Sequence, residues 1–188
     1  MSWTIHPLTP GRWADFERVM GANGACAGCW CMWWRLKRKD WEAAQGAGNR
    51  RAMRRIVGAG PPPGLIGYSE GAPVAWAQIC PRADLPTLDR SPVLAPIDAA
   101  PVWSLSCFYI RPGHRRAGWS GRLIAAAIDH AAAHGASVVE AYPWDRAGKQ
   151  SSTTIFTGIA STFARHGFRE VARRAPHRPI MRWQAPSS

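Results

Sequence analysis

The 188-residue sequence predicts a mixed α+β fold with about seven strands and about four helices. Short apolar runs rich in β-branched and aromatic residues predict the strands, and segments with apolar residues every three or four positions predict the helices. Along the chain these segments follow the order β-α-α-β-β-β-α-β-α-β-β. No internal repeat and no linker-like stretch interrupts this order, so we expect a single domain over residues 1–188.

Local signals place the individual elements. Thr9 is expected to cap the first helix with Pro10 at its first position, and Asn49 is expected to cap the second helix. The turn at residues 70–73 predicts a hairpin, whereas residues 81–101 carry Pro and Asp without a period and predict a long loop. The expected strands cover residues 3–8, 65–69, 74–80, 102–110, 137–142, 168–172 and 179–183. The expected helices cover residues 9–20, 49–57, 118–134 and 157–166.

Composition narrows the classes of function. Twenty-four Lys and Arg residues stand against 12 Asp and Glu, which gives a net charge of +12 and indicates either an anionic partner or simply a basic surface. Nucleic acid and a phosphate-rich cofactor are the two candidates, and the charge is the sole support for nucleic acid. No apolar run is long enough to span a membrane, and the first residues lack the features of a secretory signal. We therefore expect a cytoplasmic protein with no membrane partner.

Three of the five cysteines crowd together at Cys26, Cys29 and Cys31. Structural zinc needs four ligands, usually as two spaced pairs, and no second cysteine pair exists. A covalent acyl-cysteine is disfavoured because no histidine is patterned beside the cluster. We expect reduced thiols and no metal.

The most informative segment spans residues 108–124, where a strand ends in a basic, glycine-containing turn and a helix begins. The first N–H groups of a helix lack partners within it, and the helix dipole makes that end positive. Small residues at Gly118 and Gly121 let a pyrophosphate approach the backbone, although they also fit an ordinary tight turn. Three arginines add positive charge, namely Arg115, Arg116 and Arg122.

Arg115-x-x-Gly118-x-Ser120 resembles the Arg/Gln-x-x-Gly-x-Gly/Ala acyl-CoA signature of the GNAT superfamily of N-acyltransferases, with Ser in the last small position. Ile110-x-Pro112 precedes it at the family's usual distance, and Phe163-x-x-x-Gly167-Phe168 lies where the family has Tyr-x-x-x-Gly-Phe. The resemblance covers nearly the whole chain. It implies a GNAT-like, mostly antiparallel central sheet and an acetyl-CoA-dependent N-acetyltransferase that acts by direct attack in a ternary complex.

The resemblance also implies where the co-substrate binds. The backbone of Phe108 and Ile110, at a splayed strand edge, would pair with the pantetheine arm. An Asn that the family often has near the start of the last helix is Phe156 here, which puts that contact in doubt. Backbone N–H groups would hold the pyrophosphate at Arg115, Arg116, Ala117, Gly118, Trp119, Ser120 and Gly121.

The closest likeness is to a bacterial subgroup of this family with a Cys-x-Cys-Met-x-Trp-Arg segment like residues 29–35. In the family the region between the first two helices helps to form the acceptor site. Trp30, Trp33 and Trp34 are therefore candidate acceptor-binding residues, with ordinary core packing as the alternative. The implied acceptor is a small-molecule or peptide amine, and the chain is a monomer or a homodimer.

The catalytic residues are harder to predict. Glu140 is the one acid inside its apolar strand, so it is either the general base or the partner of an arginine in a salt bridge. Tyr142 lies two residues on, on the same face, and is either the general acid or a packed aromatic residue. The family's usual acid, a tyrosine, is Phe163 here. Other candidates for the acid are Cys107, Thr157, Ser161 and water, or the thiolate leaves without a dedicated acid.

Two alternatives to a small-amine acetyltransferase stay open. A non-catalytic acyl-CoA sensor would explain the missing tyrosine. Acetylation of an RNA-linked or protein amine would use the high positive charge.

Overall fold

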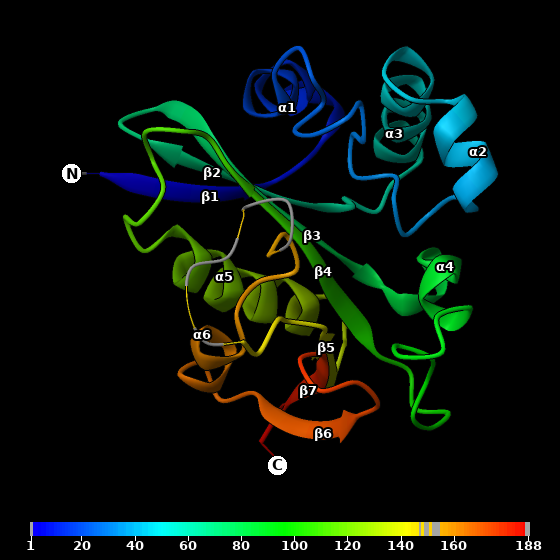
Figure 1. The fold of residues 1–188 in the computed structure, drawn as a ribbon. Helices are drawn as coiled ribbons and strands as arrows, with labels where there is room; N and C mark the ends of the chain where they lie inside the picture. The colour runs from blue at the N-terminus through cyan, green and yellow to red at the C-terminus, as the bar shows by residue number, and fades with distance from the viewer. Residues whose placement is uncertain (1, 147, 149–150, 152–154, 187–188) are drawn as a thin grey trace.

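The computed structural model describes residues 2–146, 148, 151 and 155–186. Its seven-stranded sheet has the order β1-β2-β3-β4-β5-β7-β6, and within it β4 and β5 are the one parallel pair of neighbours (Figure 1). The strands are β1 (Trp3–Pro7), β2 (Gly64–Ser69), β3 (Ala72–Pro81), β4 (Trp103–Ile110), β5 (Val138–Ala141), β6 (Arg169–Arg173) and β7 (Pro179–Gln184). This mixed, mostly antiparallel sheet confirms the predicted fold class.

Helices cover both faces of the sheet (Figure 1). The helices are α1 (Trp13–Met20), α2 (Arg38–Ala43), α3 (Ala47–Ala59), α4 (Pro86–Asp89), α5 (Trp119–Ala133) and α6 (Ala160–Ala164), with short 3-10 turns η1 (Pro10–Arg12) and η2 (Arg82–Asp84). Leu123 and Ala127 of α5 are fully buried against one face, together with Leu105 of β4. Phe16 of α1 and Met53 of α3 are fully buried against the other face. Successive side chains of a strand point to opposite faces, which lets one sheet serve both cores.

The hairpin formed as predicted. Ser69 pairs with Ala72, and the two residues between them, Glu70 and Gly71, have φ of 47° and 78°. Two residues with positive φ form the turn whose twist matches that of the flanking strands. This turn places β3 between β2 and β4, in the middle of the sheet.

Two predictions about the helices are wrong. Asn49 lies inside α3, which begins at Ala47, and its buried Nδ2 donates to the Gly28 carbonyl (3.0 Å) instead of capping the helix. Residues 81–101 are not one long loop, because they contain η2 and α4. The helix α2 was not predicted at all. Polar residues dominate α2, and α4 is only four residues long, so neither has the apolar stripe that marks a helix in a sequence.

His130 of α5 is a buried basic group without a hydrogen-bond partner at Nε2 among the described residues. Burial, and then the neighbouring His134, lower the pKa of His130 to about 4. The folded protein therefore keeps His130 neutral, whereas the unfolded chain binds a proton below about pH 6.5. Stability from this group is present above about pH 6.5 and is lost as the pH falls toward 4.

A His130→Phe variant tests this assignment. We expect it to flatten the fall of the thermal unfolding midpoint between about pH 6.5 and pH 4, because phenylalanine binds no proton in the unfolded state. His177→Phe, at an exposed histidine, is the matched control and should keep the wild-type slope. Equal slopes in wild type and His130→Phe would contradict the assignment.

None of the helices in the described part of the chain is long and apolar enough to cross a membrane.

Candidate functional site

The centre of the site is the place where β4 and β5 separate. The two strands pair over three residue pairs, which end at Leu105 and Ala141. Just beyond, the register between β3 and β4 shifts, so that Gln78 pairs with Cys107 and Ile79 with Leu105. Ser106 is thus the extra residue of a β-bulge. A bulge beside a short parallel pairing leaves backbone groups of β4 without a strand partner on the β5 side.

The turn after β4 leads directly into the start of α5. Residues 115–118 are exposed, and Gly118 precedes the helix in the left-handed conformation with φ of 78°. A side chain added at Gly118 would meet no atom within 4 Å. The turn in front of α5 is therefore open at Gly118, and a helix N-terminus beside open space can bind phosphate.

Side chains of the turn lie around the helix start. Trp119 is buried, and a Cβ on Gly67 would lie 2.5 Å from its ring. A Cβ on Gly121 would lie 2.9 Å from His166 Nε2, so glycine allows the close approach of α6. Arg115 Nε donates to the Ile110 carbonyl (3.1 Å). Arg116 has φ of 63°, Ala117 is exposed in the turn, and Ser120 lies in the first turn of α5.

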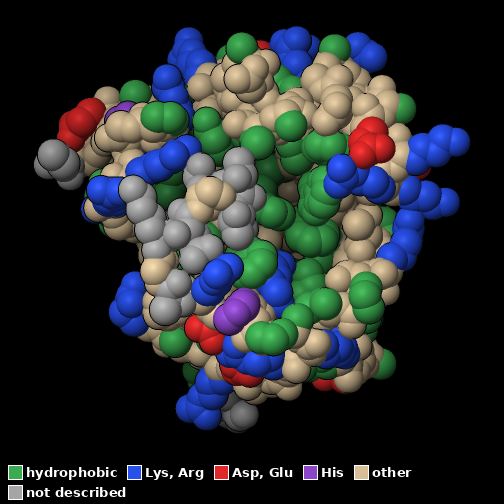
Figure 2. Space-filling model, viewed as in Figure 1, with side chains coloured by type: hydrophobic (Ala, Val, Ile, Leu, Met, Phe, Trp, Pro, Cys, Tyr) green, Lys and Arg blue, Asp and Glu red, His purple; other side chains and the backbone are tan. Residues whose placement is uncertain are grey.

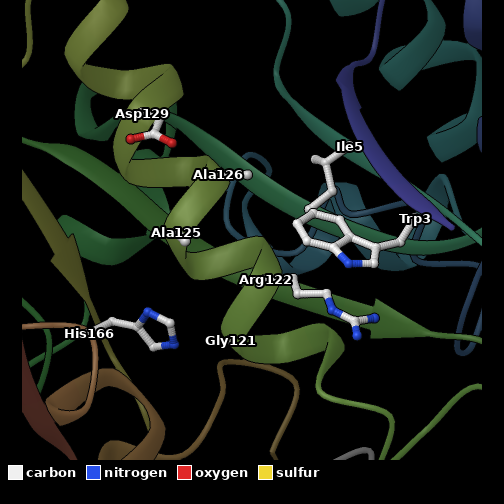
Figure 3. Close-up of a pocket in the computed structure, with 8 residues that line it drawn as sticks. All are labelled: Trp3, Ile5, Gly121, Arg122, Ala125, Ala126, Asp129 and His166. Atoms are coloured by element: carbon white, nitrogen blue, oxygen red, sulfur yellow. The ribbon is translucent and has the colours of Figure 1, made fainter. Parts of the chain in front are cut away.

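A groove of about 430 Å³ runs along the outer face of α5, between β1 and the end of α6 (Figure 3). Trp3, Arg122 and His166 are among its lining residues. Arg122 lies over the Trp3 ring at 5.0 Å. The groove adjoins the predicted pyrophosphate turn but includes neither Phe108 nor Tyr142.

The Phe108 N–H of β4, which was predicted to pair with the pantetheine arm, already has a hydrogen-bond partner within the protein. The Phe108 N–H donates to the Phe156 carbonyl at 2.6 Å. The Phe108 ring points to the α5 side of the sheet, where it contacts Phe163 at 6.0 Å between ring centroids. A ligand that pairs with the Phe108 N–H must therefore displace the Phe156 carbonyl.

Glu140 lies at the centre of a buried charge cluster. Its carboxylate is 1% exposed, and its Oε1 accepts from Arg82 Nη1 (2.8 Å), while Oε2 accepts from Arg182 Nε (2.7 Å). Asp89 and Asp98 bind the outer sides of the two guanidinium groups, at 3.0 and 2.6 Å. This is the salt bridge that the sequence left open as the alternative to a general base.

Tyr142 belongs to the same cluster. Its fully buried hydroxyl donates to Glu140 Oε1 (2.8 Å), accepts from Arg82 Nη1 (2.7 Å) and lies 2.7 Å from Ser104 Oγ. Burial, followed by the charge of Glu140, raises the pKa of Tyr142 well above its ordinary value. Tyr142 and Glu140 are thus brought together as predicted by their spacing, and their catalytic roles stay predictions.

Aromatic side chains cover the bulge. Trp34 Nε1 donates to the Ser106 carbonyl (3.1 Å), and its ring lies 6.1 Å from Phe156 and 6.3 Å from Trp33. Figure 2 shows a hollow lined by hydrophobic side chains at the centre of this face, where β4 runs in Figure 1. We call the cluster of Trp33, Trp34 and Phe156 the aromatic cluster. Trp30 lies apart from it and packs against Trp13 and Phe16 in the core below α1.

The hydrogen bond from the Trp34 indole N–H should contribute measurably to the stability of the fold. Trp34→Phe keeps a ring but removes the hydrogen bond to the Ser106 carbonyl, so we expect it to lower the free energy of unfolding by about 0.5–1.5 kcal/mol. Trp33→Phe is the matched control, because the described contacts of Trp33 are to rings and to Arg38. Urea denaturation measures both. Equal stabilities of the two variants would show that the indole hydrogen bond contributes nothing.

All five cysteines are free thiols. Burial raises the pKa of the Cys29 thiol to about 11. Cys31 Sγ lies 3.3 Å from Cys107 Sγ, and this contact, together with burial, raises the pKa of Cys107 well above its ordinary value. Such thiols are poor nucleophiles and poor metal ligands. Among the described residues no group of three or more His, Cys, Asp or Glu side chains could hold a metal.

Sequence reasoning missed the arginines of the charge cluster. Arg82 follows β3 and Arg182 lies on β7, so they are 58 and 42 residues from Glu140. Arg182 faces Glu140 because the two residues pair directly across β5 and β7. The one sign of this cluster in the sequence was an arginine within the apolar run 179–183.

Comparisons with known proteins agree with this geometry. A family model described as "Acetyltransferase (GNAT) family" matches residues 30–147. No curated protein matches the chain.

Solved structures share the fold at low sequence identity. A PaiA N-acetyltransferase from Thermoplasma acidophilum, in complex with coenzyme A, is 14% identical with a TM-score of 0.51, over 98% of this chain and 100% of that one. A GNAT family acetyltransferase from Streptococcus agalactiae is 12% identical with a TM-score of 0.58, over 98% and 96%. A polyamine N-acetyltransferase from Drosophila melanogaster is 10% identical with a TM-score of 0.55, over 98% and 100%.

Proposed function

Because the chain belongs to the acetyltransferase (GNAT) family, we propose that it transfers the acetyl group of acetyl-CoA to a primary amine by direct attack in a ternary complex. The observation that carries the proposal is the separation of β4 from β5 beside the bulge at Ser106, directly before a glycine turn and the start of α5. This arrangement places the edge of β4 between the proposed phosphate site and the aromatic cluster. The likeness to a bacterial subgroup with the segment 29–35 stays a prediction.

We place the pyrophosphate at the backbone N–H groups from Arg115 through Gly121, as the sequence predicted. The pantetheine arm would run along β4 at Phe108 and Ile110, and it would replace the Phe156 carbonyl as the acceptor for the Phe108 N–H. The thioester would then lie at the bulge, below Trp34. Coenzyme A in the Thermoplasma structure is consistent with acetyl-CoA as the co-substrate.

The acceptor nitrogen attacks the thioester carbon, the new C–N bond forms, and the C–S bond breaks with its electron pair going to sulfur. Most of the rate would come from holding the two reactants in line in a site closed to water. Glu140 is the proposed base and Tyr142 the proposed acid. The hydroxyls of Tyr142 and Ser104 form the route by which a proton from the bulge would reach Glu140, since both carboxylate oxygens are buried.

The experiment that tests the function measures release of CoA from acetyl-CoA in the presence of a panel of small-molecule and peptide amines. Release that depends on the amine, with the acetylated amine found by mass spectrometry, supports it. The second candidate is an acyl-CoA sensor, favoured by the buried Phe163 at the position of the family's tyrosine. Tight binding of acetyl-CoA without turnover of any amine would favour the sensor.

A further inference from the structure

The acidic side chains around the proposed acyl site are all engaged with arginine. Glu140 has a bound donor on each carboxylate oxygen, and Asp89 and Asp98 close the cluster on its outer sides. Beyond these, the contacts made by Trp33, Trp34 and Phe156 in the described part of the chain involve no acidic side chain. A positively charged acceptor would find no free carboxylate here to hold it.

Among the described residues, the unpaired charge beside the aromatic cluster is positive and belongs to Arg178. The Arg38 guanidinium also lies over the Trp33 ring, 4.8 Å from its centroid, but its Nε is paired with Glu42 Oε1. Arg178 Nη1 donates to Thr157 Oγ1 (3.0 Å), next to Phe156, and the guanidinium lies over Trp144. No carboxylate pairs with Arg178 in the described part of the chain, and its burial lowers its pKa to about 10. Like charge so placed disfavours a cationic ligand.

Protonation of the acceptor then decides which amines can react. An alkylamine resembles lysine, whose pKa is about 10.4, so about one molecule in a thousand or fewer is unprotonated at neutral pH. It must lose a proton before it can attack. An aromatic amine is already neutral, because its lone pair is shared with the ring, and its flat ring suits the surfaces of Trp33, Trp34 and Phe156.

We infer that the acceptor of this acetyltransferase is a weakly basic aromatic amine rather than an alkylamine or a polyamine, an inference that rests on the proposed function. In the reaction Ar–NH₂ + CH₃CO–S–CoA → Ar–NH–COCH₃ + HS–CoA, the nitrogen lone pair forms the C–N bond. The C–S electron pair leaves with sulfur, and one N–H proton ends on the thiol. No carboxylate has to deprotonate the amine beforehand. Glu140 needs to receive a proton, through Tyr142 and Ser104, only after the attack.

The test compares aniline with benzylamine, which carry the same ring but differ in the basicity of the nitrogen. Calorimetry first establishes whether acetyl-CoA binds. We then expect kcat/KM for aniline at neutral pH to exceed that for benzylamine by at least about tenfold, because nearly all benzylamine is protonated. In alkaline buffer benzylamine becomes neutral and is the stronger nucleophile, so the difference should shrink or reverse. That reversal would show that charge, and not the added methylene, sets the preference.

A variant pair tests whether the ring binds at the aromatic cluster. Trp33→Leu should raise KM for aniline severalfold and leave the Kd of acetyl-CoA unchanged. Trp103→Leu, at a half-buried tryptophan that contacts His130 and His134, is the matched control and should leave KM for aniline unchanged. Equal KM values in wild type and Trp33→Leu would overturn the placement.

Each other outcome has a definite meaning. Faster turnover of benzylamine than of aniline at neutral pH overturns the inference and leaves the proposed function intact. Binding of acetyl-CoA without turnover of either amine also overturns the inference. Failure to bind acetyl-CoA overturns the proposed function, and the inference falls with it.

Discussion

Replacing Glu140 with glutamine is expected to lower the free energy of unfolding by about 3–5 kcal/mol, the typical cost of breaking a buried ion pair from one side. The variant would leave the guanidinium groups of Arg82 and Arg182 buried without the carboxylate that both of them bind. Each would keep its outer partner, Asp89 or Asp98. Urea denaturation followed by circular dichroism measures the loss.

Glu170→Gln is the matched control for stability. Glu170 pairs with Arg173 at 2.6 Å on β6, but its side chain is 43% exposed. An exposed pair contributes about 0–1 kcal/mol, so this variant should unfold almost like the wild type. Equal losses of unfolding free energy in Glu140→Gln and Glu170→Gln would mean that the buried cluster contributes no more stability than an exposed ion pair.

The same substitution tests the predicted base when activity is measured at a temperature where the variants are folded. If Glu140 receives the proton, kcat should drop by about 10²–10⁴. Arg182→Gln separates catalysis from stability, because it breaks the cluster but keeps the carboxylate. A similar kcat for Glu140→Gln and Arg182→Gln would remove Glu140 from the list of catalytic residues.

Gly118→Val is expected to weaken acetyl-CoA binding by at least about hundredfold. The valine side chain would fill the open space in front of the α5 N–H groups, and losing two hydrogen bonds to a charged pyrophosphate costs about 3–6 kcal/mol. Isothermal titration calorimetry with acetyl-CoA measures the change.

The chain offers a close control for the backbone effect of this change. Gly135, just beyond the other end of α5, has φ of 82° and also meets no atom within 4 Å of an added Cβ. Gly135→Val therefore carries the same left-handed strain without entering the predicted site. An equal loss of affinity in the two variants would show that strain, and not the pyrophosphate site, explains the result.

The parts of this fold that the sequence predicts are those with a local signal. Alternating and apolar runs predicted the seven strands, and the Glu70–Gly71 turn predicted the pairing of β2 with β3. By contrast, α2 buries only Trp41, so no periodic stripe marks it. Asn49 has the residue type of a cap, but a carbonyl 21 residues away determines its place.

In the candidate site, too, the features with a local sequence signal could be predicted and those set by distant contacts could not. The turn from Arg115 to Gly121 could be predicted because strand, glycine and helix follow one another along the chain. The partners of Glu140 could not, because Arg82 and Arg182 reach it only through the pairing of distant strands. Trp30 and Trp34 are four residues apart, yet positive φ at Trp30 and Cys31 turns the chain so that the two rings lie in different clusters.

The position of Arg182 also constrains the order in which the chain assembles. Strands β2 and β3 are joined by the two-residue turn Glu70–Gly71, so this hairpin has a short loop to close, whereas α1, α2 and α3 lie between β1 and β2. Glu140 lies on β5, which pairs with β4 over three residue pairs and reaches Arg82, just after β3, through an ion pair. Its second guanidinium comes 42 residues later, on β7. Until β7 pairs with β5, Glu140 has one of its two counter-charges, so this pairing completes the neutralisation of the buried carboxylate.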